Sequence, residues 1–212
     1  MDNLSLLIQA PVLNVQLLID GLCIGATFAL AAYGLAMVWG VMNVKNLCQG
    51  DMVILGGFLA VTLANNGVHP IFGLPLAIVV LFVYGWVVYR LIICRVIERD
   101  LFTSLLATFG LAIVMAQSMN LIFGPEVVTA DSGFESRQLF GGLVTIAEIK
   151  LISLGLAAIL AAIVIVFMKR SRMGQAIRAT AQDARAARVM GIDTDRVYQF
   201  TYALNAAICG AA

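Results

Sequence analysis

The chain has 212 residues, of which 62% are hydrophobic and 12% charged, and its formal net charge is +1. Soluble domains average roughly 45 to 50% apolar and about 25% charged residues, so this composition excludes an ordinary soluble fold and predicts a polytopic membrane protein. The low net charge hides a strong asymmetry, because ten of the thirteen basic residues lie in the stretches 90 to 99 and 169 to 196.

Apolar runs near the ~20 residues needed to cross the hydrocarbon core predict the transmembrane helices. Five such uncharged runs occur, at 21 to 44, 71 to 89, 101 to 123, 151 to 168 and 197 to 212. A sixth run, 52 to 66, gives only ~22 Å of helix and is too short to cross unaided. We therefore expect an all-α bundle of about six spans that forms one transmembrane domain over residues 1–212, with a short second span.

Small residues recur at three- to four-residue spacing along the first span. They are Gly21, Gly25, Ala29, Ala32, Ala36 and Gly40. Such rows let transmembrane helices approach closely, so we expect them to pack the bundle together rather than to line a pathway.

The stretch "NLCQGDMVILGGF", residues 46 to 58, interrupts the apolar sequence with polar residues and glycines immediately before the short span. A polar breaker of this kind is typical of a discontinuous span, in which unwound backbone and a helix N-terminus face a cavity instead of lipid. Asp51 either only caps a helix that begins near Met52 or also joins this cavity. The predicted lining residues are Asn46, Gln49, Gly50, Asp51, Gly56 and Gly57.

Other polar residues carry weaker signals. Thr108, Gln117 and Asn120 on the 101 to 123 span are expected to form interhelical hydrogen bonds, and His69 beside Pro70 is expected to be a turn residue. The four widely spaced cysteines predict reduced thiols rather than a redox or metal site. With no nucleophile–base pair, metal cluster or phosphate-binding loop, we expect neither an enzyme nor a cofactor.

Charge distribution predicts the orientation. The basic 169 to 196 loop is expected to be cytoplasmic and the acidic 124 to 150 loop external, because short cytoplasmic loops are enriched in Lys and Arg. Counting spans backwards places Lys45 inside and the N-terminus outside.

The cytoplasmic segment 171 to 197 predicts one helix from Gln175 to Met190, ended by Gly191. Its apolar surface is made mostly of alanine. It either docks into a groove on another protein or lies on anionic lipid, and the absence of large interfacial side chains favours docking.

A third stretch, "LLATFGLAIVMAQSMNLIFG", completes a set of three motifs with this segment and "NLCQGDMVILGGF". With these motifs the chain resembles the H-type membrane permease of branched-chain amino acid ABC importers. The resemblance runs from about Asp20 to the last residue. The resemblance implies that 171–197 is the coupling segment that grips an ATPase. The implied contact residues are Gly174, Ala176, Ala179, Asp183, Ala184, Ala187, Gly191 and Ile192. Where relatives often carry Ala-His-Gly-Glu, this chain has Cys48, Gln49, Gly50 and Asp51, so no role is expected for the histidine.

The resemblance also implies a location and partners. We expect a multi-pass protein of the bacterial inner membrane, in contact with lipid and assembled with a second permease subunit, two cytoplasmic ABC ATPases and a periplasmic solute-binding protein, but with no nucleic acid. The implied solute is leucine, isoleucine, valine or a related amino acid. An ion-coupled secondary transporter and an ABC permease for urea or short amides are the alternatives. Because family permeases are longer, we expect this sequence to be the N-terminal part of one.

Overall fold

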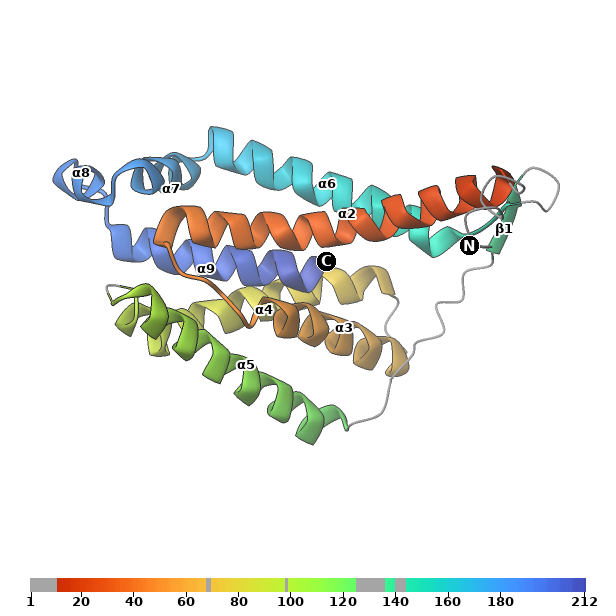
Figure 1. The fold of residues 1–212 in the computed structure, drawn as a ribbon, viewed down its shortest axis with the longest axis horizontal. Coiled ribbons are helices and arrows are strands. Elements are labelled where there is room, and N and C mark those ends of the chain that lie inside the picture. The colour runs from red at the N-terminus through yellow and green to blue at the C-terminus, as the bar shows by residue number, and fades with distance from the viewer. Residues whose placement is uncertain (1–10, 68–69, 98, 125–135, 140–143) are drawn as a thin grey trace, which may run out of the picture.

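Long apolar helices run side by side along the molecule (Figure 1). The computed structural model describes residues 11–67, 70–97, 99–124, 136–139 and 144–212. Its long helices are α2 (Pro11–Met42), α4 (Pro70–Leu91), α5 (Leu101–Phe123) and α6 (Glu148–Arg170). Four segments within or overlapping them, 14–42, 72–95, 101–123 and 150–170, are long and apolar enough to cross a membrane. The prediction of an all-α polytopic membrane protein is thus confirmed.

Two further helices have less apolar length. The short second span is α3 (Gln49–Asn65), whose 17 residues give about 25 Å of helix, and α9 (Thr194–Ala211) corresponds to the expected last span. The expected count of about six spans is met only if α3 and α9 are added to the four segments that are long and apolar enough to cross a membrane. Residue 98 and the segments 68–69, 125–135 and 140–143, which include His69 and most of the expected external loop, lie outside the described residues.

The helix α9 lies at the centre of the bundle. It packs mainly against α4, and also against α2 and α3. Close approach to α4 depends on Gly85, because a Cβ there would lie 2.6 Å from the Cβ of Ala206. A helix surrounded by others needs less apolar length than one that faces lipid, which explains why α9 contains buried Thr201 and Asn205.

The small-residue row of the first span does not pack this bundle together, contrary to expectation. Gly21, Gly25 and Gly40 are exposed, and a Cβ added at any of them would meet nothing within 4 Å. The face of α2 that packs inward carries Cys23, Leu30, Gly34, Met37 and Val38. The row therefore forms an outward surface on α2.

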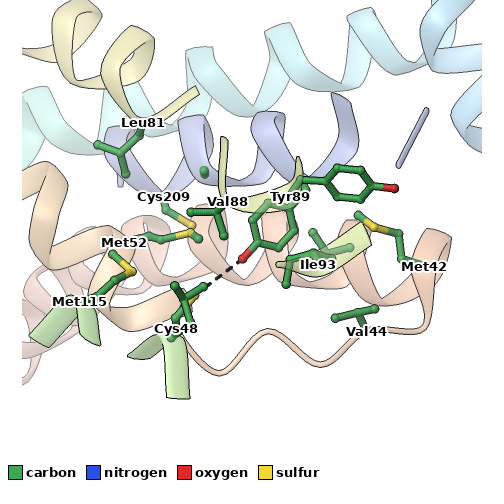
Figure 2. Packing of buried hydrophobic residues seen from close by; sticks show 14 of the residues in the cluster. Met42, Val44, Cys48, Met52, Leu81, Val88, Tyr89, Ile93, Met115 and Cys209 are labelled. Atoms are coloured by element: carbon green, nitrogen blue, oxygen red, sulfur yellow. Dashed lines mark hydrogen bonds between the residues drawn. The ribbon is translucent and has the colours of Figure 1, made fainter. Parts of the chain in front are cut away.

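The main apolar core lies around the start of α3 (Figure 2). Residues from α2, α3, α4, α5 and α9 meet there, with the short 3-10 helix η1 (Ile93–Arg95) closing one side. Figure 2 labels Met42, Val44, Cys48, Met52, Leu81, Val88, Tyr89, Ile93, Met115 and Cys209 in this cluster. The polar residues near the start of α3 are thus surrounded by a tightly packed apolar shell.

The two ends of the molecule differ in structure. A short antiparallel hairpin, β1 (Ser136–Leu139) paired with β2 (Val144–Ala147) in the register Ser136 to Ala147, lies at one end, and α7 (Arg172–Gln182) and α8 (Ala184–Val189) lie at the other (Figure 1). The expected single helix from Gln175 to Met190 is therefore wrong. The chain breaks at Asp183, which has extended backbone angles and ends α7.

Candidate functional site

A break in the helical chain separates α2 from α3. The helix α2 ends at Met42, Asn43 adopts a positive φ of 56°, and α3 begins at Gln49. Figure 1 shows the linker 43–48 running from the end of α2 back along the bundle to the start of α3. Its side chains alternate, with Val44, Asn46 and Cys48 buried and the intervening residues exposed. The linker thus has one face against the core and one face outward, and it ends in a turn at residues 47–48.

The backbone of this linker is only partly satisfied. The carbonyl oxygen of Lys45 accepts a hydrogen bond of 2.9 Å from Thr108 Oγ1 on α5, so the expected interhelical bond of Thr108 goes to the linker and not to another helix. The backbone N–H groups of residues 44–48 form no backbone–backbone hydrogen bond within the described parts of the chain. At membrane depth, amides without a backbone acceptor need another partner, such as a side chain, water, a ligand or another subunit.

A buried polar network joins the linker to α9. Asn46 Oδ1 accepts from the Cys48 thiol at 2.9 Å and from the Tyr202 hydroxyl at 3.4 Å. The dashed line in Figure 2 marks the contact of 3.7 Å between Cys48 and Tyr202. Because Asn46 is buried and bonded to its own chain, its side chain holds the linker in place.

Gln49 forms the second half of the network. Its Nε2 donates to Asn205 Oδ1 at 3.1 Å, and Asn205 Nδ2 donates back to Gln49 Oε1 at 2.9 Å. Gln49 Nε2 also lies 2.9 Å from the carbonyl oxygen of Ala31 and 2.8 Å from Cys209 Sγ. The first turn of α3 is thereby bonded to α2 and α9 together.

Asp51 does not cap α3. The helix begins one turn before the predicted start, at Gln49, with Cys48 at the N-cap and no side-chain cap bond. Asp51 lies in the first turn, is half-buried, and forms no hydrogen bond to the described residues. The thiol of Cys48, at the N-cap, bonds to the side chain of Asn46 and not to a backbone amide of the first turn.

The predicted glycines fall into two groups. Gly56 is buried against α9, where an added Cβ would lie 2.8 Å from the Cα of Gly210, so it permits close helix packing. Gly50 and Gly57 are exposed with nothing within 4 Å of an added Cβ. Together with exposed Ile54, at helical spacing between them, they form one open face of α3.

A groove of about 460 Å³ lies beside the break. It is lined by Ala32, Leu35, Ala36, Trp39, Lys45, Asn46 and Leu47. The Lys45 ammonium lies 4.9 Å from the centroid of the Trp39 ring, a cation–π arrangement that leaves the charge at the rim of an otherwise apolar groove.

The structure gives α8 two defined ends. Asp183 accepts hydrogen bonds from the amides of Arg185 and Ala186 at 2.8 and 3.0 Å, and these bonds lower the pKa of its carboxyl below the usual range. At the other end Gly191 has a φ of 85°, and the amides of Gly191 and Ile192 donate to the carbonyls of Arg188 and Ala187. The predicted role of Gly191 in ending the helix is confirmed.

The expected coupling residues do not form one exposed surface. Gly174 and Ala187 are buried within the chain, Ala176, Ala179, Ala184 and Ile192 are half-buried, and Asp183 and Gly191 are exposed. The large apolar side chains that reach solvent here are instead Val189 and Met190, which are 86% and 81% exposed.

The predicted interhelical bonds of two polar residues on α5 are wrong, and three polar residues on α9 were not predicted. Gln117 and Asn120 on α5 are exposed, and their side chains form no interhelical bond to the described residues. Tyr202, Asn205 and Cys209, which face the break from α9, were not predicted. Their spacing of three and four residues along one helix face was the available signal.

Comparison with known proteins places the chain. Residues 17–212 match the family described as "Branched-chain amino acid transport system / permease component". The chain is 28% identical to the high-affinity branched-chain amino acid transport system permease protein LivH of Salmonella typhimurium, over 93% of this chain and 68% of that protein. It is 24% identical to BraD of Pseudomonas aeruginosa, over 93% of this chain and 69% of that protein.

A third relative comes from Methanocaldococcus jannaschii. The probable branched-chain amino acid transport permease protein LivH of Methanocaldococcus jannaschii is 26% identical, over 94% of this chain and 65% of that protein. No solved structure matches the chain. Since the family match covers nearly all of the sequence and the apolar helices suit a multi-pass inner-membrane protein, the chain belongs to the permease components of branched-chain amino acid transport systems.

Proposed function

We propose that this permease forms the solute path of an ATP-driven importer for leucine, isoleucine, valine or related amino acids. It works with a second permease subunit, two cytoplasmic ABC ATPases and an extracytoplasmic binding protein. The permeases that this chain resembles are named for branched-chain amino acid transport, which supports the substrate class. The 169 to 196 region lies on the cytoplasmic side and the N-terminus outside.

The observation that carries the proposal is the pair α7 and α8. These helices continue beyond the end of α6, and α8 ends in the adjacent exposed side chains Val189 and Met190. Exposed arginines flank them, at Arg185 and Arg188. Methionine and arginine are enriched in protein interfaces, and an apolar pair with a basic rim suits a groove on an ATPase. We define Val189 and Met190 as the docking pair.

The proposed coupling segment remains 171–197, within a single permease domain over 1–212, but its residues divide by role. The buried and half-buried members, including Ala187 and Ala184, hold α7 and α8 against the bundle, since Ala184 packs on the main core. The docking pair and the exposed Asp183 and Gly191 face the partner.

The path residues divide in the same way. Asn46, Gln49 and Gly56 are occupied by contacts within the chain and position the break. The solute passes along the open face of α3, where Gly50 and Gly57 leave room and the half-buried Asp51 supplies a carboxylate with no hydrogen-bond partner among the described residues. The linker amides, which form no backbone–backbone hydrogen bond in the described parts of the chain, lie beside the start of this face.

This chain also offers a surface against which the second permease subunit can pack. The outward row of small residues on α2 allows close helix approach, and the groove beside Trp39 and Lys45 continues it toward the break. We propose that this face meets the second permease.

The docking pair provides the test. In the complete importer, the double variant Val189→Asp and Met190→Asp should release the ATPases during purification and abolish ATP-dependent uptake, because carboxylates would be buried in an apolar contact. Asn65→Asp, an exposed residue at the far end of α3, is the matched control and should keep both properties. Normal ATPase retention in the double variant would overturn the proposal.

A further inference from the structure

The break in the membrane and the cytoplasmic α8 are connected by one helix, α9. We infer that Asn205 is the positioning residue through which α9 transmits movement of α8 to the break, so that ATP hydrolysis opens the solute path. The inference rests on the proposed function and names the link that the function requires between its two sites.

The first part of the link joins α8 to α9. Arg188 Nε on α8 donates a hydrogen bond of 2.6 Å to Thr194 Oγ1, the first residue of α9. Asp193 caps α9 by accepting from the Arg196 amide at 3.2 Å, and the turn between the helices is fixed by Gly191. With a short, bonded connection, α8 cannot rotate without displacing the start of α9.

The second part carries displacement along α9. Thr194 and Asn205 are eleven residues apart in one uninterrupted helix, or about 17 Å. Close contacts at Gly56 and Gly85 pack α9 tightly against α3 and α4, so a displacement of α9 is passed to these neighbours. Tyr202, Asn205 and Cys209 all face the break.

The third part is the amide pair of Asn205 and Gln49. Asn205 is fully buried, and two of its hydrogen bonds are made to Gln49, the first residue of α3, while a third comes from the Cys209 thiol one turn along α9. The pair is in direct contact with α2, because a Cβ at Gly34 would lie 2.4 Å from Asn205 Oδ1. A buried amide pair is directional, unlike an apolar contact, so it fixes the start of α3 to one position on α9.

Cys209 offers Gln49 a second hydrogen-bond acceptor on α9. Gln49 Nε2 lies within bonding distance of both Asn205 Oδ1 and Cys209 Sγ, which are one turn apart on α9. An amide nitrogen has two hydrogens, and here it faces three acceptors once the Ala31 carbonyl is counted. A shift of α9 along its axis therefore exchanges partners on Gln49 without leaving the amide unbonded.

The test compares three variants of the complete importer in proteoliposomes. Asn205→Leu keeps the branching and number of side-chain heavy atoms but removes the hydrogen bonds to Gln49, and should lower solute imported per ATP by about 5- to 150-fold while ATPases still co-purify. The swap Gln49→Asn with Asn205→Gln restores an amide pair of the same summed length and should recover most of the ratio. Thr201→Val is the control, because Thr201 is equally buried on α9 but, among the described residues, bonds to the Val197 carbonyl of its own helix and not to another helix.

The outcomes separate the inference from the proposed function. Wild type without ATP-dependent uptake would refute the proposed function itself. Wild-type uptake with an unchanged import-to-ATP ratio in Asn205→Leu would overturn only the role of Asn205. If Asn205→Leu cannot be purified, the swap variant decides: a well-assembled swap variant with an import-to-ATP ratio near that of the wild type supports the amide pair, and one without uptake refutes it.

Discussion

Gly56 and Gly57 are adjacent on α3 but have different surroundings. Replacing Gly56 with alanine would place a Cβ 2.8 Å from the Cα of Gly210, and backbone cannot move aside as a flexible side chain can. We expect a loss of about 1 to 3 kcal/mol in unfolding free energy, as for overpacked cores.

Gly57→Ala is the control for that loss. An added Cβ at this position meets nothing within 4 Å, and alanine favours helix over glycine. Thermal unfolding of the purified permease in detergent should show a lower midpoint for Gly56→Ala and an equal or higher one for Gly57→Ala. Equal losses in both variants would contradict the close approach of α3 and α9.

Individual residues also show where sequence reasoning stops. The polar run from Asn46 to Asp51 was recognisable because it interrupts an apolar stretch, which is a local signal. Its partners were not, because Gln49 bonds to Asn205, which is 156 residues away, and only tertiary packing brings them together. Asp51 was wrongly predicted as a cap because α3 begins at Gln49, one turn earlier than the apolar run suggests, which puts Asp51 inside the first turn.

At the scale of elements, the division between α7 and α8 depends on Asp183. The run of alanine, arginine and glutamine favours one helix, and propensity alone cannot show that the Asp183 carboxylate will accept the amides of Arg185 and Ala186. The end at Gly191 was predictable because a glycine with positive φ follows from local sequence.

The pKa of Asp183 gives this break a dependence on pH. Hydrogen bonds from the Ala186 and Arg185 amides lower the carboxyl pKa in the folded state, so the cap is present at neutral pH and is lost as pH falls through that lowered pKa. Asp183→Ala should remove the cap at all pH values, and Asp183→Asn should keep it while removing its acid sensitivity.

Hydrogen exchange of the Arg185 and Ala186 amides measures both effects. In the wild type, protection should be constant near neutral pH, after correction for intrinsic exchange, and decrease only in acid. Protection that is unchanged in Asp183→Ala would mean that α8 does not need this cap.

At the scale of the whole molecule, the long helices alternate in direction, as successive membrane crossings require. The helices α2, α4 and α6 all end toward the α7 and α8 end of the molecule, and α3 and α5 end toward the other (Figure 1). The number of crossings was harder to predict, because a central helix such as α9 and a span interrupted by a linker do not follow the rules for lipid-facing helices.

Membrane-impermeant thiol labelling tests this orientation. In a background without the exposed Cys94, a cysteine at Asn65 should react from outside the cell, and one at Gln182 should react only after the membrane is opened. Both positions are exposed in the structure, so differences in labelling report sidedness and not burial. The reverse pattern would invert the whole topology.

ATP-driven uptake is the most direct test of the proposed function. The complete importer, with its second permease and ATPases, should be reconstituted in proteoliposomes. ATP is supplied on the side of the ATPases, and labelled leucine and the binding protein are supplied on the opposite side. We expect accumulation that requires ATP hydrolysis and continues when an ionophore removes all ion gradients. Accumulation that proceeds without ATP and collapses with the ionophore would show an ion-coupled carrier and contradict the proposal.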